Sequence, residues 1–267
     1  MDWNLSPVAF TFTWHEMIWP VRWYGLFFAS TFIYGLLLFR WIYRRENRDA
    51  DLVYDLALLV IAGTLVGARL GFVLFYDPAY FLAHPMEVFK VWKGGLASHG
   101  AVAGILASIF LYAKLYPSCS FLWLCDRIGM AVPLSGCLIR LGNFCNSELY
   151  GIPAGDIPWA VRFLRVDDLL RHPVQLYESF AYLLIFIYQW HAYYHRGAGA
   201  CRGLLFGNFL VMVYGARILL EFFKPEQARW LVSSLPLTMG QMLSLPLVLT
   251  GSYLIWRAHK QDRNPAG

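Results

Sequence analysis

The amino-acid sequence predicts an all-α integral membrane protein, a bundle of about seven transmembrane helices with a small cap outside the membrane. The 267 residues are 58% hydrophobic and 15% charged, whereas an ordinary soluble domain is roughly 25% charged. The mean hydropathy is +0.48, and the apolar runs have the length, about 20 residues, that a helix needs to cross a bilayer. A transmembrane barrel would show alternating strands of about ten residues instead. A soluble globule, a disordered chain and a barrel are therefore excluded.

We expect a single transmembrane domain, 1–267, in which seven apolar segments each form one membrane-spanning helix. Pro173 and Pro236 stand before the fifth and seventh segments, where a missing backbone N–H does least harm to a helix. The only long connection that we expect is 140–171, which holds glycines, prolines and acidic residues and is long enough for a compact cap. The spans lie near 19–40, 52–76, 95–116, 121–139, 174–194, 203–223 and 238–256.

Clusters of cations set the expected orientation. Arg44, Arg45 and Arg48 directly follow the first span, and cations in short loops favour the cytoplasmic side. With seven spans, the basic C-terminal tail lies on that same side. We therefore expect the N-terminus and the cap on the outer side of the membrane and the C-terminus in the cytoplasm. Juxtamembrane cations also explain the net charge of +5, so this charge does not indicate nucleic-acid binding.

The sixth span carries three polar residues on one helix face. Tyr214, Arg217 and Glu221 stand at positions i, i+3 and i+7. An ionisable side chain near the bilayer centre costs about 2.5–3.5 kcal/mol on insertion scales, so such a group is a functional candidate. The alternative is an architectural ion pair, because Arg217 and Glu221 have salt-bridge spacing.

A second polar stripe follows the fourth span. Arg140, Asn143 and Asn146 are spaced by three and share a face if the helix continues. Gly142 lets another backbone or a ligand approach closely, as a phosphate site requires. An ordinary amphipathic helix end, capped by Asn146 or Ser147, is the alternative.

His99 is a lone histidine at the start of the third span. Gly95, Gly100 and Gly104 are expected to keep its surroundings open, and an imidazole titrates near the pH at which a general base works best. A histidine with a purely structural role is the alternative. Arg22, beside Tyr24, is typical of a cation and an aromatic residue at the membrane interface.

These polar groups describe a pocket for a lipid with an anionic head group, because guanidinium groups bind phosphate through paired hydrogen bonds. Neither a metal nor a cofactor is expected, since the five cysteines form no C-x-x-C pair and the His191–His195 pair has no third ligand nearby. The set comprises Arg69, His99, Arg140, Asn143, Asn146, Glu148, Arg217 and Glu221.

The chain resembles bacterial prolipoprotein diacylglyceryl transferases, and the resemblance runs over nearly its whole length. The stretch from Arg140 to Glu148 is the most specific part of it. The matching stretches are Trp23-Tyr24-Gly25-Leu26, Gly67-Ala68-Arg69-Leu70-Gly71, Gly94 to Gly100, Arg140 to Glu148, His172 to Glu178, Arg217 to Phe223 and Met239-Gly240-Gln241.

The resemblance implies transfer of a diacylglyceryl group from phosphatidylglycerol to the lipobox cysteine thiol of a preprolipoprotein, at the outer side of the inner membrane, with release of glycerol phosphate and without a cofactor. It implies that Arg140 and Arg217 bind the phospholipid and that His99 is the base. The remaining residues expected to bind substrate or support the site are Tyr24, Arg69, Asn143, Asn146, Glu148, Gly151, Tyr214 and Glu221.

Three departures from the family pattern leave alternatives open. Ile139 stands where the family usually has Gly, Val213 takes the place of the family's Tyr so that Tyr214 is one residue later, and the segment 151–172 is shorter than expected. One alternative is a related transferase with a different acceptor. The other is a non-catalytic carrier or transporter of anionic phospholipids, in which the arginines bind head groups and His99 is structural.

Overall fold

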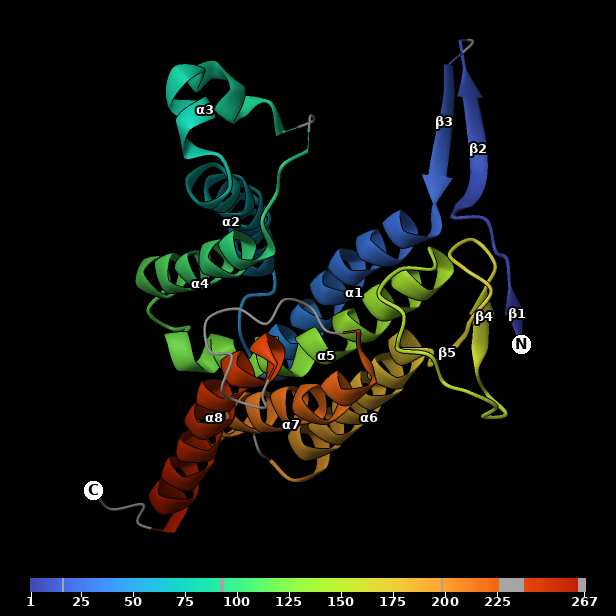
Figure 1. Cartoon of the computed structure of the whole chain (residues 1–267). Helices are drawn as coiled ribbons and strands as arrows, with labels where there is room; N and C mark the ends of the chain where they lie inside the picture. The colour runs from blue at the N-terminus through green and yellow to red at the C-terminus, as the bar shows by residue number, and fades with distance from the viewer. Residues whose placement is uncertain (16, 92–93, 198, 226–237, 264–267) are drawn as a thin grey trace. The chain divides into compact units, whose positions relative to one another are not determined.

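The computed structural model describes residues 1–15, 17–91, 94–197, 199–225 and 238–263. They form two compact units, 1–35 with 126–267 and 36–125, and each unit is described by itself. The elements in chain order (Figure 1) are β1 Asp2–Trp3, β2 Val8–Trp14, β3 Met17–Arg22, α1 Trp23–Arg45, α2 Leu52–Phe75, α3 Pro78–Ala83, η1 Pro85–Phe89, α4 Ser98–Leu115, α5 Phe121–Cys145, β4 Val161–Phe163, β5 Leu170–Arg171, α6 Val174–His195, α7 Leu204–Leu220, η3 Glu221–Phe223 and α8 Met239–Arg263.

The helices confirm the predicted fold class, an all-α membrane protein. Each of the seven predicted spans contains a long helix: α1, α2 and α4 to α8. Within the described part of the chain, four helices are long and apolar enough to cross a membrane, and the shorter His99–Leu115 is also apolar. The count of seven membrane crossings stays a prediction. The four candidates are Trp23–Arg45, Leu52–Phe75, Phe121–Cys145 and Leu204–Phe223.

A β-hairpin precedes the first helix and corrects the prediction that a span begins near residue 19. β2 and β3 pair antiparallel, with Phe12 opposite Trp19, and α1 begins only at Trp23. Phe12 and Trp19 are each more than half exposed. Residues 17–21 are apolar like the helix that follows, and hydropathy alone does not distinguish an apolar strand from an apolar helix.

Glycines join α2 and α4 in unit 36–125. A Cβ at Gly67 or Gly104 would collide with the backbone of the facing helix, at Gly100 and Gly63 respectively. Small residues spaced by four allow this close approach. Gly100 and Gly104 therefore form a contact between helices. The prediction that they keep the surroundings of His99 open is wrong.

The connection between α2 and α4 is also longer than predicted. Residues 76–97 contain α3 and η1, so 140–171 is not the only long connection. Arg69 on α2 holds this segment through hydrogen bonds to the carbonyl oxygens of Val88 at 2.8 Å and Gly94 at 2.7 Å. A buried cation thus organises the connection.

The predicted cap folds around a small sheet in the other unit. The strand order is β1-β4-β5, and β1 pairs parallel with β4, which places Trp3 opposite Phe163. Phe144, Val161 and Phe163 form its buried core. The N-terminus is therefore built into the cap, which the sequence analysis did not predict.

Four helices of this unit position the candidate site. α6, α7 and α8 follow one another along the chain and lie side by side (Figure 1). Tyr182 on α6 lies against Gly136 on α5, where a Cβ would be 2.9 Å from its ring. α5 continues to Cys145, beyond the predicted end at residue 139, so it carries Arg140 and Asn143 as one helical stripe.

Candidate active site

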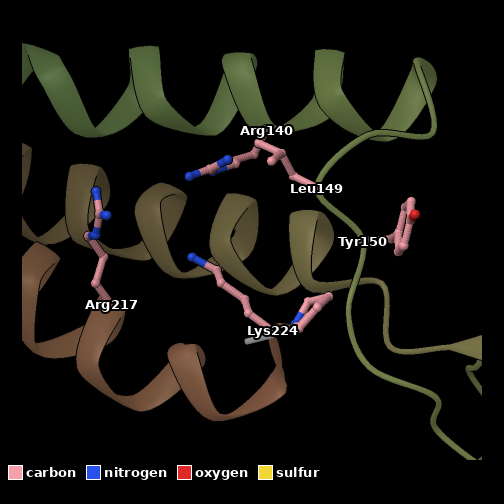
Figure 2. A pocket seen from close by; sticks show the side chains of 6 residues that line it. Arg140, Leu149, Tyr150, Arg217 and Lys224 are labelled. Carbon is pink, nitrogen blue, oxygen red and sulfur yellow. The ribbon is translucent and has the colours of Figure 1, made fainter. Parts of the chain in front are cut away.

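Three cations from different parts of the chain line one cavity. The cavity has a volume of about 340 Å³ and is lined by Arg140, Leu149, Tyr150, Arg217, Lys224 and Pro225. Figure 2 shows Arg140 extending from α5, Arg217 from α7 and Lys224 from the segment after η3 toward a shared space. The structure therefore brings the two predicted lipid-binding arginines to one pocket and adds a lysine.

Arg140 is held in place by a buried carboxylate. Its Nε lies 2.7 Å from Oε2 of Glu178 on α6, and the Glu178 side chain is 1% exposed. Its Nη1 donates to Oδ1 of Asn143 at 3.3 Å, which is the predicted stripe on α5. These two contacts orient the guanidinium group at the edge of the cavity.

Glu178 also holds Lys224. Its Oε1 lies 2.8 Å from the Lys224 Nζ, so one buried carboxylate bridges two cations. A buried charge is costly unless it is paired, and here both oxygens have a cationic neighbour. Neither Glu178 nor Lys224 was among the predicted site residues, although Glu178 lies in the matching stretch His172 to Glu178.

Arg217 and Glu221 do not form the pair that their spacing permits. Among the described residues, the cation paired with Glu221 is Lys224, at 3.4 Å. Glu221 is the C-cap of α7, and its N–H still donates to the Arg217 carbonyl, so the helix end does not separate the two residues. The Glu221 carboxylate lies instead against Lys224 and Thr238. The Nε of Arg217 is buried without a hydrogen-bond partner in the described structure, and its guanidinium carbon lies 5.9 Å from the Tyr214 ring centroid.

The start of α8 fixes Glu221. Thr238 Oγ1 donates to Glu221 Oε1 at 3.2 Å, and a Cβ at Gly240 would meet the carboxylate at 2.5 Å. Thr238 and Gln241 exchange two hydrogen bonds, of 3.1 and 3.3 Å, which form a capping box. The carboxylate therefore lies at the positive end of a helix dipole.

Asn146 and Glu148 lie just beyond α5. Asn146 Nδ2 donates to Glu148 Oε1 at 2.5 Å, and the Glu148 carbonyl accepts a hydrogen bond from Gln175 on α6. Asn146 also continues the α5 hydrogen-bond pattern, because its N–H donates to the Gly142 carbonyl. The predicted polar stripe of Arg140, Asn143 and Asn146 is thus formed by the last two turns of α5 and the residue that follows them.

Gly142 and Gly151 both allow close packing, Gly142 against Tyr24 on α1 and Gly151 within the cap. A Cβ at Gly142 would lie 3.0 Å from the Tyr24 ring and 3.2 Å from its Cα, so the predicted close approach is made by the α1 backbone. Gly151 is buried in the cap, where its N–H donates to the His172 carbonyl at 2.9 Å. These contacts hold α5 against α1 and hold the cap segment at Gly151 against His172.

Arg69 and His99 belong to the other unit. Arg69 donates four hydrogen bonds, to the carbonyls of Glu87, Val88, Gly94 and Gly95. This geometry favours a structural role for Arg69 over the predicted contact with substrate.

His99 is exposed near the start of α4. Its ring lies 5.9 Å from the Tyr76 ring in a stacked arrangement and 5.4 Å from the Phe75 ring in an edge-on arrangement. The imidazole is thus accessible and flanked by aromatic rings.

Among the described residues at the cavity, the charges do not cancel. Arg140, Arg217 and Lys224 supply three positive charges, and the carboxylates of Glu178 and Glu221 supply two negative ones. The set carries one excess positive charge in a partly buried place. Such a pocket suits a singly charged anion, and the planar fork of arginine suits the oxygens of a phosphate.

Comparison with known proteins identifies relatives over almost the whole chain. Residues 7–257 match the family described as prolipoprotein diacylglyceryl transferase. Three relatives are each named phosphatidylglycerol–prolipoprotein diacylglyceryl transferase. The protein from Chloroherpeton thalassium is 48% identical over 97% of this chain and 94% of its own. Those from Tolumonas auensis and Porphyromonas gingivalis are 42% and 41% identical, over 97% of this chain and 98% and 95% of their own.

Proposed function

The chain belongs to the prolipoprotein diacylglyceryl transferase family, and we propose that it transfers the diacylglyceryl group of phosphatidylglycerol to a cysteine thiol of a prolipoprotein. The family and the class of enzyme, a membrane transferase, follow from the match over residues 7–257 and from the 48% identical relative. The roles of individual residues are the part that we propose.

The observation that carries the proposal is the meeting of Arg140 and Arg217 in one cavity. Glu178 orients Arg140, and the buried Nε of Arg217 has no hydrogen-bond partner in the described structure. An unsatisfied buried donor is costly, and a phosphate oxygen would satisfy it. We propose that the two guanidinium groups hold the phosphodiester of phosphatidylglycerol.

The reaction is a displacement at a glyceryl carbon. The thiolate sulfur forms a bond to that carbon, the carbon–oxygen bond to the phosphate breaks, and its electron pair stays on the phosphate oxygen. The products are a thioether and glycerol phosphate. Cationic groups fixed around the phosphate favour the charge that develops on it in the transition state.

The thiol proton must pass to a base, and we propose His99 for this role. A thiol of pKa about 8.5 is only a few per cent ionised at neutral pH, so a base raises the concentration of the nucleophile. Exposure of His99 near the start of α4 supports the role. We retain Tyr24, Asn143, Asn146, Glu148 and Tyr214 as proposed supporting residues.

A transfer assay tests the proposal. Purified protein is incubated with phosphatidylglycerol labelled in its acyl chains and with a peptide that contains a lipobox cysteine, and the peptide is analysed for a thioether. We expect labelled peptide with the wild-type protein and none with a Cys→Ser peptide. Binding of labelled lipid without any transfer would favour the alternative, a carrier or transporter of anionic phospholipids.

The acceptor is the less constrained substrate, because the segment 151–172 of the cap is shorter than the family resemblance leads us to expect. A panel of peptides that differ around the cysteine tests whether this chain prefers another acceptor. A transferase that modifies thiols outside a lipobox context would support that alternative.

We also propose that the protein lies in the bacterial inner membrane with its N-terminus and cap in the periplasm and its C-terminus in the cytoplasm. The cation cluster at the end of α1 supports this orientation, since Arg44 and Arg45 lie in its last turn. Reporter fusions at Asn47 and Asp156 should give opposite signals. Matching signals would contradict the proposed topology.

A further inference from the structure

Lys224 lies between two carboxylates at the edge of the cavity. Its Nζ is 2.8 Å from Glu178 and 3.4 Å from Glu221, and its side chain is 15% exposed. In Figure 2 its amine end lies in the space toward which Arg140 and Arg217 also extend. Lys224 is thus a third cation of the pocket, in addition to the two arginines of the proposed function.

The charge of the phosphate changes during the proposed reaction. A phosphodiester carries one negative charge, which equals the excess positive charge of the pocket. When the carbon–oxygen bond breaks, the phosphate becomes a monoester, whose charge at pH 7 is about −1.5 to −2. The second negative charge therefore exceeds the excess positive charge of the pocket, and a cation that turns from its carboxylates toward the phosphate would stabilise that charge locally.

Of the three cations, Lys224 is best able to supply that charge. Glu178 and Asn143 hold Arg140, whereas an ammonium group on a four-carbon stem rotates readily and has three donors. Each carboxylate keeps one polar contact if Lys224 turns away. Glu178 keeps Arg140, and Glu221 keeps Thr238 and the start of α8.

We propose that Lys224 is a further catalytic residue, which turns from Glu178 and Glu221 to the leaving phosphate as the carbon–oxygen bond breaks. The electron pair of that bond goes to the phosphate oxygen, and Lys224 pairs with the resulting charge without giving up a proton. The proposal rests on the proposed function. It predicts that Lys224 contributes to the transition state and to the doubly charged product more than to the substrate.

The first test compares Lys224→Gln with wild type in the transfer assay. Loss of one donor aimed at a developing oxyanion typically lowers kcat by about 10²–10³-fold, and we expect such a fall with KM for phosphatidylglycerol within about threefold. Lys260→Gln, at the exposed C-terminal part of α8, is the matched control and should behave as wild type. A Lys224→Gln enzyme with wild-type kcat would overturn the proposal.

A second test separates catalysis from simple neutralisation of Glu178. If Lys224 served only as a counter-ion, Glu178→Gln would remove the need for it, and the double variant Lys224→Gln/Glu178→Gln would be no slower than Glu178→Gln alone. We expect the double variant to be slower by the same factor as the single Lys224 change. Equal rates for Glu178→Gln and the double variant would contradict the proposal.

A binding measurement that needs no turnover completes the design. Glycerol 1-phosphate should bind the wild-type protein more tightly at pH 8, as a dianion, than at pH 5.5, as a monoanion, and Lys224→Gln should lose most of this difference. An unchanged difference would overturn the proposal. If wild type makes no thioether, the proposed function fails. If wild type is active and Lys224→Gln is unaffected in every assay, only the role of Lys224 fails.

Discussion

Glu178 on α6 and Arg140 on α5 form a buried ion pair, in which Oε2 of the carboxylate lies 2.7 Å from Nε of the guanidinium group. The same carboxylate also lies 2.8 Å from the Lys224 Nζ. The pair links two helices whose residues are far apart in the sequence.

Removing one partner of this pair should destabilise the protein. Glu178→Ala leaves Arg140 and Lys224 without their shared carboxylate, and loss of one partner of a buried pair costs about 3–5 kcal/mol. We expect a clear fall in melting temperature in detergent. Asp2→Ala, which breaks the exposed contact with Arg162, should change stability by less than about 1 kcal/mol. Equal melting temperatures for Glu178→Ala and wild type would show that the pair is not formed.

The contact between α2 and α4 predicts a strong effect of side-chain size. At Gly104, any Cβ would collide with the backbone of Gly63, whereas a Cβ at Gly35 on α1 would meet nothing within 4 Å. Overpacking typically costs about 1–3 kcal/mol. Gly104→Val should therefore lower the melting temperature, and Gly35→Ala should not. A Gly104→Val protein as stable as wild type would refute the close contact between the two helices.

The cap should lose stability in acid. Arg171 donates hydrogen bonds to Asp167 at 3.1 Å and to the Gly151 carbonyl at 3.1 Å. The hydrogen bonds from Arg171 hold the pKa of the Asp167 carboxyl below its ordinary value of 3.8. A lowered carboxyl pKa adds stability above the unfolded value, and that stability is lost as the pH falls through the folded value.

We therefore expect cap protection against hydrogen exchange to be constant from pH 5 to 8 and to fall below about pH 4. Asp167→Asn should remove this fall and give the cap lower protection at neutral pH. If wild type and Asp167→Asn responded to acid in the same way, the pair would make no contribution to cap stability.

His99→Gln tests the proposed base. Gln keeps a polar side chain but cannot take up a proton, and general-base assistance contributes about 10²–10⁴-fold. The variant should be slowest relative to wild type near pH 7 and recover toward pH 9.5, as the thiol ionises without help. A deficit that stays constant with pH, or no deficit, would assign His99 a structural role beside Tyr76.

The positions of the helices were predictable because each long helix lies in one of the apolar segments of the sequence. The hairpin was not, since Trp19 and its neighbours are as apolar as the helix that follows. Spacing suggested that Arg217 pairs with Glu221. The Glu221 carboxylate contacts Lys224 and Thr238 instead, and spacing on one helix does not reveal such competing partners.

The sequence predicted contacts between residues that share one helix face. It did not predict contacts between residues on different helices. Arg140 and Asn143 are one turn apart on α5, so their contact follows from the sequence. The contacts of Glu178 with Arg140 and Lys224 connect residues 38 and 46 positions apart, from the numbering. Periodicity within one helix carries no information about which side chain of another helix faces it.

The central claim is that Arg140 and Arg217 hold the lipid phosphate through their paired donors, and replacement of each by Lys tests it most directly. Lysine keeps the charge but lacks the planar fork, so Arg140→Lys and Arg217→Lys should each lose about 10²-fold or more in kcat/KM for phosphatidylglycerol. Arg165→Lys on the exposed cap is the matched control and should retain wild-type transfer. Near-normal turnover of either pocket variant with phosphatidylglycerol would contradict the account.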